Sequence, residues 1–176
     1  MVNENIWAPW RMAYIRQLDP DGGPAQKDSC FLCDAARFGP DSDEGRDRLL
    51  LVNDDRGLLM LNRYPYTNGH LLVAPPEHLA ELSDLSAADR ARLMELTHLA
   101  EQLVRTAMNA QGVNIGINLG RCAGAGLPGH LHVHIVPRWS GDTNFITTVG
   151  QVRVVPEALE QSHARMTQAL AQMAEE

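Results

Sequence analysis

The sequence is poor in positive charge, and lysine is nearly absent from it. Its 176 residues include 15 basic and 22 acidic side chains, which give a formal net charge of -7, and Lys27 is the one lysine. Proteins that bind duplex nucleic acid usually present a field of Lys and Arg, so this balance argues against a polymeric nucleic acid partner. Lys27 stands in a Gly- and Pro-rich segment that predicts a loop, which argues against catalysis by lysine.

Long hydrophobic runs are also missing. No apolar run approaches the roughly 18 residues that a membrane span requires. Residues 1–11 mix polar and charged side chains with apolar ones, unlike the continuous hydrophobic region of a signal peptide. The sequence therefore predicts a cytoplasmic protein without a membrane partner.

Cysteine is scarce, and three copies are too few for a disulfide framework in a chain of this length. Cys30 and Cys33 stand together in CFLC, a spacing that suits two metal ligands or two redox thiols. The third cysteine, Cys122, is predicted to be a free thiol, and His98 and His163 are predicted to lie at the surface.

Hydrophobic residues make up 44% of the chain and charged residues 21%, as in one ordinary globular domain. A long helix is predicted to begin after Ser86, which is a typical N-cap residue and has Asp89 at the capping-box position three residues later. This helix is predicted to end at Gly112. A closing helix is predicted in residues 156–176, with Pro156 near its first turn. Short apolar runs bounded by turn signals predict strands in residues 48–54, 57–63, 69–76, 113–120 and 130–139. The first three of these strands are predicted to form an antiparallel meander. The predicted fold is α+β, with one five-stranded antiparallel sheet, a long helix and a C-terminal helix.

Three of the seven histidines stand at every second position in HLHVHIV, where His130, His132 and His134 alternate with aliphatic residues. Alternation over six residues predicts a strand with imidazoles on one face and aliphatic side chains on the core face. Alternate strand residues lie roughly 6.6 Å apart, so one tetrahedral ion can reach two neighbouring rings at most. At least one of the three histidines must have another role.

A Gly-rich connection, NLGRCAGAGLPG from Asn118 to Gly129, precedes the histidine strand. Glycine lets main-chain amides approach an anion closely, as in other phosphate-binding loops. A flexible hairpin loop is the alternative interpretation of this segment taken alone. Beside three histidines on the next strand, the segment favours phosphate binding.

HLHVHIV resembles the signature of the histidine triad (HIT) family of nucleotide hydrolases and transferases. LNRYPYTNGHLLVAPPEH resembles the family's strand, turn and Gly-His segment, and Asn118 stands where the family has an amide before its phosphate loop. The flanking IWAPWRMAYI and PRWSGDTNFI resemble the branch of bacterial diadenosine tetraphosphate phosphorylases. With this resemblance we expect an N-terminal arm and linker in residues 1–29, a HIT domain in residues 30–150, and a C-terminal helical extension packed on it in residues 151–176.

The resemblance implies cleavage of a dinucleoside polyphosphate at its α-phosphate, with His132 as the nucleophile that forms a nucleotidyl-histidine intermediate. His134 would donate a hydrogen bond to a phosphate or leaving-group oxygen, and inorganic phosphate or water would complete the reaction. His70 would support the first triad ring from the neighbouring strand, the alternative being a core histidine with one backbone partner. The implied substrate-binding residues are Asn62 at the ribose, and Asn118, Gly124, Ala125, Gly126 and His134 at the phosphates.

The resemblance also implies a structural zinc ion, because several bacterial members bind zinc with two thiolates and two histidines. The residues at those positions are Cys30, Cys33, His78 and His130, a Cys2His2 set that suits tetrahedral zinc. His130 would then hold the metal and leave the other two triad histidines for chemistry.

The phosphate loop departs from the simplest family pattern, since GAGLPG lacks the Ser or Thr that stands shortly before the first histidine there. Candidate replacements downstream are Ser140, Thr143 and Thr147. Two further functions stay open, namely hydrolysis of AMP-linked phosphoramidates or other nucleotidyl conjugates, and nucleotide binding by a regulatory module without catalysis. His132 favours an enzyme, because pure binding needs no nucleophile.

The long helix is predicted to help form a homodimer, because it has apolar residues on more than one stripe and an antiparallel sheet leaves exposed edges. The apolar residues are Leu93, Met94, Leu96, Leu99, Leu103, Val104 and Met108. The resemblance implies that two chains pair across this helix and the adjacent strand into one sheet with C2 symmetry. The arm IWAPWRMAYI and Trp139 are the expected aromatic contributors to a shared nucleoside pocket, with packing inside their own chain as the alternative.

Overall fold

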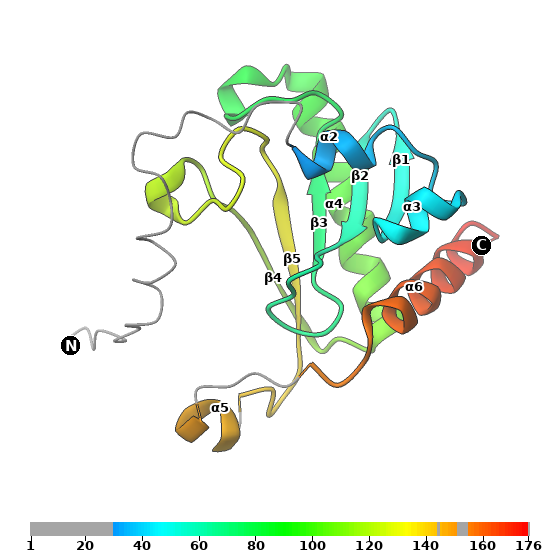
Figure 1. The fold of residues 1–176 in the computed structure, drawn as a ribbon, viewed down its shortest axis with the longest axis vertical. Coiled ribbons are helices and arrows are strands. Elements are labelled where there is room, and N and C mark those ends of the chain that lie inside the picture. Colours follow the sequence, from blue (N-terminus) through cyan, green and yellow to red (C-terminus); the bar gives the residue numbers. More distant parts are fainter. Residues whose placement is uncertain (1–29, 144, 151–154, 176) are drawn as a thin grey trace.

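A five-stranded antiparallel sheet lies at the centre of the computed structural model, which describes residues 30–143, 145–150 and 155–175 (Figure 1). Each neighbouring pair of strands runs antiparallel. In spatial order the strands are β1 (Leu50–Asp54), β2 (Gly57–Leu61), β3 (Leu71–Ala74), β5 (Val133–Arg138) and β4 (Gly112–Ile117). The predicted α+β class, the five strands and the meander of the first three are thereby confirmed.

The long helix α4 (Ala87–Met108) starts where the sequence predicts it. The Ser86 side chain accepts a hydrogen bond from the Asp89 backbone N–H, so the predicted N-cap is present. The helix ends before Gly112, the predicted end, because Asn109 adopts the left-handed conformation with φ 52°. Asparagine tolerates this conformation better than most residues, which explains how it closes the helix in place of glycine.

Shorter helices flank the sheet, several of them where no helix is predicted. Two of these span five residues each, too few to show the apolar period of a helix in the sequence. The elements are α2 (Phe31–Ala35), α3 (Asp43–Asp47), the 3-10 turns η2 (Leu82–Asp84) and η3 (Arg121–Ala123), α5 (Phe145–Gly150) and α6 (Leu159–Met173). Within the described ranges, no helix has the length and apolar character to cross a membrane.

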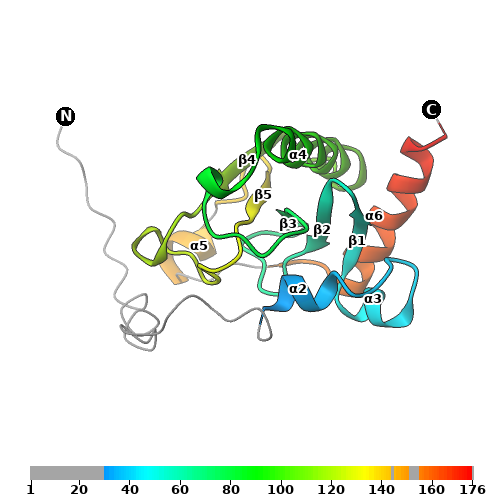
Figure 2. The same ribbon diagram turned by 90° about the horizontal axis from the view of Figure 1, so that it is seen from above.

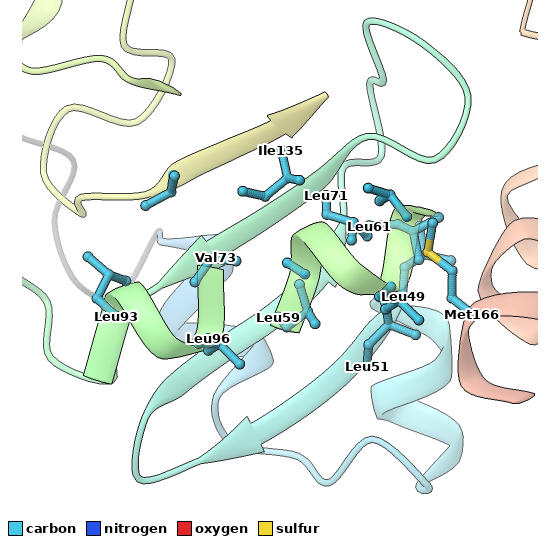
Figure 3. Packing of buried hydrophobic residues seen from close by; sticks show 14 of the residues in the cluster. Leu49, Leu51, Leu59, Leu61, Leu71, Val73, Leu93, Leu96, Ile135 and Met166 are labelled. Atoms are coloured by element: carbon cyan, nitrogen blue, oxygen red, sulfur yellow. The ribbon is translucent and has the colours of Figure 1, made fainter. Parts of the chain in front are cut away.

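Different helices cover the two faces of the sheet, with α4 on one face and α2 and α3 on the other (Figure 2). Side chains alternate along β2, so Leu59 and Leu61 pack on the α4 side while Leu58 and Met60 pack on the α2 side. Helix α6 contacts α4 and β1, and its Met166 joins the α4 side of the core (Figure 3). Because both faces are covered, all five residues of β2 are buried.

Two sequence expectations about exposure are wrong. His163 is a buried residue of α6, and its ring Nε2 donates to the Leu50 carbonyl oxygen at 2.8 Å. The apolar residues of α4 mainly fill the core of their own chain, since most of those named above are buried there. The buried ones are Leu93, Leu96, Leu103, Val104 and Met108. Met94 is 65% exposed, so the excess apolar surface on this helix is much smaller than expected. His98 is exposed as predicted, and Cys122 is a free cysteine as predicted, with an exposed side chain.

Candidate active site and metal site

The histidine-bearing segment joins the sheet later than its alternation predicts. Strand β5 begins at Val133, so His134 lies on the strand and the other two triad histidines precede it. The chain pairs elsewhere before the strand, since the Leu131 backbone N–H donates to the Leu79 carbonyl oxygen at 2.6 Å. The alternation of faces continues nevertheless, because Leu131, Val133 and Ile135 are all buried in the core on the α4 side.

A pocket of ≈ 940 Å³ opens beside the triad. The expected catalytic and substrate-binding residues that line it are Asn62, Asn118, Gly124, Gly126, His132 and His134. Ala125, which is also expected at the phosphates, is buried and does not line the pocket. Three aromatic residues that the sequence analysis did not single out line the pocket as well, namely Phe31, Tyr64 and Tyr66. The two tyrosines follow Asn62 closely in LNRYPYTNGH, and this proximity is the signal that points to them.

A main-chain hydrogen bond fixes the tautomer of His132. Its Nδ1 lies 2.9 Å from the carbonyl oxygen of His130, and a carbonyl can only accept, so Nδ1 carries the proton. The lone pair of the neutral ring is then on Nε2. Burial lowers the pKa of His132, although its hydrogen bond to the His130 carbonyl partly opposes this shift. The ring is therefore a neutral nucleophile at neutral pH, with its reactive lone pair on Nε2.

A chain of hydrogen bonds sets the tautomer of His134. The Tyr66 backbone N–H donates to His70 Nδ1 at 3.1 Å, so the His70 proton is on Nε2. His70 Nε2 lies 3.0 Å from His134 Nδ1 and donates to it, which places the His134 proton on Nε2. The sequence analysis expects His70 to support the first triad ring, but in the structure it contacts the third, His134. The reason is that His70 directly precedes β3, whose Leu72 pairs with His134.

Burial keeps these two rings uncharged. It lowers the pKa of His70 to about 3, with smaller contributions from His134 and His132. Burial likewise lowers the pKa of His134 to about 4, with a smaller contribution from His132. Tyr66 packs over both rings, with centroids 4.6 Å from that of His70 and 5.7 Å from that of His134. The neutral rings preserve a directional chain of donors and acceptors that protonation would break.

Two asparagine amides join the same network. The Asn62 Oδ1 accepts from the Tyr64 backbone N–H at 2.9 Å, which leaves its Nδ2 to face His70 Nδ1 at 3.3 Å. The Asn118 amide lies 3.5 Å from His134 Nε2. Because His134 Nε2 carries a proton, it needs an acceptor. A flip of the Asn118 side-chain amide, which exchanges its Oδ1 and Nδ2, provides that acceptor. The contacts of both amides with a nucleotide stay predictions.

The four predicted metal ligands come together in one cluster. They are Cys30, Cys33, His78 and His130, whose donor atoms all lie within 4.8 Å of one another. Cys33 Sγ lies 3.2 Å from His78 Nδ1, and His130 Nδ1 lies 3.4 Å from Cys30 Sγ and 3.5 Å from Cys33 Sγ. A tetrahedral zinc ion with bonds of 2.0–2.3 Å separates its ligands by roughly 3.3–3.8 Å, so the spacing fits.

The tautomer of His130 suits a metal ligand. Its Nε2 donates to the Pro75 carbonyl oxygen at 3.0 Å, so the lone pair on Nδ1 faces the thiols. Burial lowers the pKa of His130 to about 4, which keeps the ring neutral as coordination requires. Of the three triad histidines, only His130 belongs to this cluster, while His132 and His134 line the pocket.

A second cavity, of ≈ 510 Å³, shares Tyr66 with the triad pocket. The hydroxyl residues considered above as loop replacements line this cavity and not the triad pocket; they are Ser140, Thr143 and Thr147. Trp139 also lines it, and its Nε1 donates to the Met108 carbonyl oxygen at 3.2 Å. Trp139 therefore packs against its own chain, and the arm IWAPWRMAYI lies outside the described residues.

Fold and site together define a protein of the histidine triad type. The model of the HIT domain matches residues 45–141, and the chain belongs to this family of nucleotide hydrolases and transferases. AP-4-A phosphorylase of Mycobacterium tuberculosis is 36% identical over 158 residues, which cover 89% of this chain and 78% of that protein. An uncharacterized HIT-like protein of Saccharolobus solfataricus is 35% identical over 118 residues, 66% of this chain and 79% of that protein.

Solved structures show the same fold. A Zn-bound histidine triad family protein from Mycobacterium smegmatis has a TM-score of 0.67 and 29% identity, covering 85% of this chain and 99% of that chain. A hypothetical histidine triad nucleotide-binding protein from Sulfolobus tokodaii strain7 has a TM-score of 0.60 and 28% identity, covering 71% and 85% of the two chains. The expected family is thereby confirmed.

Proposed function

We propose that the protein cleaves a dinucleoside polyphosphate, such as diadenosine tetraphosphate, at its α-phosphate and transfers the nucleotidyl group to inorganic phosphate. One observation carries this proposal: His132 has a lone pair on Nε2 and His134 has a proton on Nε2, beside a single pocket. The two ring centroids lie 4.9 Å apart. A nucleophile and a hydrogen-bond donor at this separation can act on one phosphate group.

In the first step, the Nε2 lone pair of His132 forms a bond to the α-phosphorus, and the bond from this phosphorus to the bridging oxygen breaks. The electron pair of the broken bond leaves with the second nucleotide, which is ATP when the substrate is diadenosine tetraphosphate. His134 Nε2–H donates to the leaving oxygen or to a phosphate oxygen. The His130 carbonyl, which accepts from His132 Nδ1–H, stabilises the positive charge that develops on the nucleophile.

In the second step, an oxygen of inorganic phosphate attacks the same phosphorus, and the phosphorus–nitrogen bond breaks. The electron pair returns to His132 and ADP is released. Attack by water would release AMP instead, so the acceptor decides between phosphorylase and hydrolase. Similarity to AP-4-A phosphorylase along 89% of this chain supports phosphate as the acceptor.

The phosphate contacts are proposed to come from the loop that follows β4. Gly124 has φ 89°, a backbone conformation that favours glycine, and its N–H donates to the Arg121 carbonyl oxygen at 2.9 Å, which closes the turn. Gly124 is therefore proposed to shape the loop beside the phosphates, and the amides of Ala125 and Gly126 are proposed to donate to phosphate oxygens. The Asn118 side chain is proposed to contribute a further hydrogen bond to the same group.

The nucleoside is proposed to lie against the opposite wall of the pocket. Asn62 is proposed to contact the ribose, because it lines the pocket and its amide faces His70. Phe31 and Tyr64 line the pocket while 45% and 82% exposed, so their rings have free surface on which a nucleobase can stack.

We also propose that Cys30, Cys33, His78 and His130 hold a structural zinc ion. The ligand spacing and the tautomer of His130 fit the ion, and a structurally similar family member was solved with zinc bound. All four ligand positions are filled by protein, so the ion would supply no catalytic water. Its proposed role is to attach α2 to the segment that bears the triad.

A homodimer through α4 and β4 is proposed as the assembly. Strand β4 lies at one edge of the sheet, and Ile115 on it is 50% exposed. Met94 on α4 is 65% exposed. Pairing of two β4 edges would cover unpaired main-chain groups and continue the sheet across both chains. Within each chain we propose residues 30–150 as the HIT domain, with the C-terminal extension packed on it.

Product analysis with diadenosine tetraphosphate, with and without inorganic phosphate, tests the proposed reaction. We expect ADP and ATP in equal amounts, formed only when phosphate is present, and no product from His132→Ala. AMP and ATP formed without phosphate would identify a hydrolase. Turnover of an adenosine phosphoramidate in preference to the tetraphosphate would support the phosphoramidase alternative. Tight nucleotide binding without any turnover would support the regulatory module.

A further inference from the structure

The loop between β2 and β3, residues 62–70, is held by the C-terminal part of the chain. The Asn68 side chain on this loop donates from Nδ2 to Glu157 Oε2 at 3.3 Å. The Ser162 hydroxyl lies 2.7 Å from the same carboxylate oxygen and 3.2 Å from Asn68 Oδ1. Ser162 is fully buried on α6. The single Ser162 proton points to the nearer acceptor, Glu157 Oε2, so Asn68 and Ser162 both donate to one carboxylate oxygen. Three side chains from two distant segments thus form one hydrogen-bond network.

Two further contacts limit the movement of this loop. Thr67 Oγ1 donates to the Pro137 carbonyl oxygen on β5 at 3.1 Å. Gly69 has φ 73°, and a Cβ atom at this position would lie 3.1 Å from Met108 and 3.2 Å from Met166. The loop backbone therefore packs directly against side chains of α4 and α6.

The same loop provides the hydrogen bonds that set the tautomers of His70 and His134. These two histidines are called the relay below. The Tyr66 backbone N–H donates to His70 Nδ1 at 3.1 Å, and the Asn62 Nδ2 amide faces the same nitrogen at 3.3 Å. Both donors belong to the loop, and together they keep the His70 proton on Nε2. If the loop moved so that both contacts exceeded about 3.5 Å, His70 Nδ1 would lose its two donors and His70 could adopt the other tautomer. His134 would then present a lone pair to the substrate oxygen where the reaction requires a proton.

We propose that Asn68, Glu157 and Ser162 are positioning residues, whose network holds the loop where Tyr66 and Asn62 fix the tautomers of His70 and His134. None of the three network residues lines the triad pocket, so the network acts through the relay and not by contact with the nucleotide. The expected effect on rate rests on the proposed function, whereas the expected effect on the tautomers does not.

Asn68→Asp breaks the network with little change in side-chain size. It replaces the amide that donates to Glu157 with a second carboxylate, which Glu157 repels. Correctly placed proton donors contribute about 10²–10⁴-fold to enzymatic rates, so we expect kcat to fall at least about tenfold. KM is expected to change less than kcat, because the phosphate contacts of the loop after β4 remain while those of Asn62 and Tyr64, which lie on the displaced loop, weaken. Combining Asn68→Asp with Glu157→Gln restores an amide–carboxylate contact with the partners exchanged, and we expect it to restore kcat.

Arg165→Ala is the matched control. Arg165 forms an ion pair with the other oxygen of Glu157 and is 54% exposed, so its removal leaves the contacts of Asn68 and Ser162 intact. We expect its kcat to equal that of the wild type. Ser162→Ala removes one donor without adding charge and provides the same test, with a smaller expected loss of kcat, if Asn68→Asp does not fold.

Nitrogen NMR of the labelled full-length chain tests the proposal without turnover, because ring-nitrogen chemical shifts report which nitrogen carries the proton. We expect His70 and His134 to be protonated on Nε2 in the wild type and in the exchanged double variant, and to show mixed tautomers in Asn68→Asp. Unchanged shifts and kcat in Asn68→Asp would overturn the proposal, as would a double variant that stays as slow as the single one. Absence of turnover in the wild type would contradict the proposed function alone.

Discussion

Acidification from pH 7 to pH 5 is expected to destabilise the protein through His70. This side chain is fully buried and its pKa is lowered to about 3, whereas a histidine in an unfolded chain has a pKa of about 6.5. Between these two values the unfolded chain binds a proton that the folded chain does not. The free energy of unfolding therefore has its full value above about pH 6.5 and falls as the pH falls toward the folded pKa.

The size of the effect follows from the distance between the working pH and the unfolded pKa. At pH 5 an unfolded histidine is about 1.5 units below its pKa, and each unit corresponds to about 1.4 kcal/mol, so His70 accounts for a loss of about 2 kcal/mol. The folded pKa hardly enters, because pH 5 is still well above it. His134 is partly exposed and acts in the same direction with a smaller contribution.

Urea unfolding followed by circular dichroism at both pH values measures this loss, and His70→Gln is the matched variant. A glutamine side chain can accept from the Tyr66 backbone N–H and donate to His134, but it does not titrate. All other titrating groups, the Cys2His2 cluster included, are common to both proteins. We expect the wild type to lose about 2 kcal/mol more than the variant. Equal losses in the two proteins would refute a neutral, buried His70.

His132→Ala should abolish turnover while calorimetry finds nucleotide affinity largely unchanged, because the phosphate-binding amides remain; activity within about tenfold of wild type would rule out covalent catalysis by this residue. Freshly purified protein should contain one zinc ion per chain by elemental analysis, and Cys30→Ser should lose both the metal and thermal stability. Chelator-free protein without zinc would contradict this site. Light scattering at micromolar concentration should give twice the chain mass of 19.4 kDa, and the mass of a single chain would exclude the dimer.

Local patterns in the sequence locate the strands and the long helix, because each of them depends on neighbouring residues, although β5 begins at Val133 and not at His130 as its alternation predicts. The apolar runs between turn signals became the strands, and Ser86 with its periodic apolar residues became the start of α4. The end of α4 was misplaced because two residues, Asn109 and Gly112, can both close a helix. The tertiary structure decides between them, because Gly112 already belongs to β4, where it pairs with Arg138 on β5.

The candidate site depends on contacts that no local pattern describes. Spacing alone left Cys30 open between a thiol and a ligand, and resemblance to the family was needed to pair it with His130, 100 residues away. His70 meets His134 across 64 residues of sequence through the register of β3 and β5. Which ring nitrogen carries a proton depends in turn on which main-chain atom it meets, and this requires the folded structure.

His130 and His132 lie two residues apart, yet the main chain gives them opposite tautomers. His130 Nε2–H donates to the Pro75 carbonyl, which leaves Nδ1 for a metal, while His132 Nδ1–H donates to the His130 carbonyl, which leaves Nε2 for the substrate. The proposed reaction then requires only the carbonyl oxygen of residue 130, which accepts from His132 Nδ1–H. The metal site requires only that the side chain of residue 130 be a metal ligand. His130→Cys should therefore bind zinc and keep kcat within about tenfold of wild type, whereas His130→Ala should lose the metal. Elemental analysis and steady-state kinetics on one preparation measure both properties. A zinc-loaded His130→Cys protein as inactive as His132→Ala would show that the His130 ring itself takes part in the reaction.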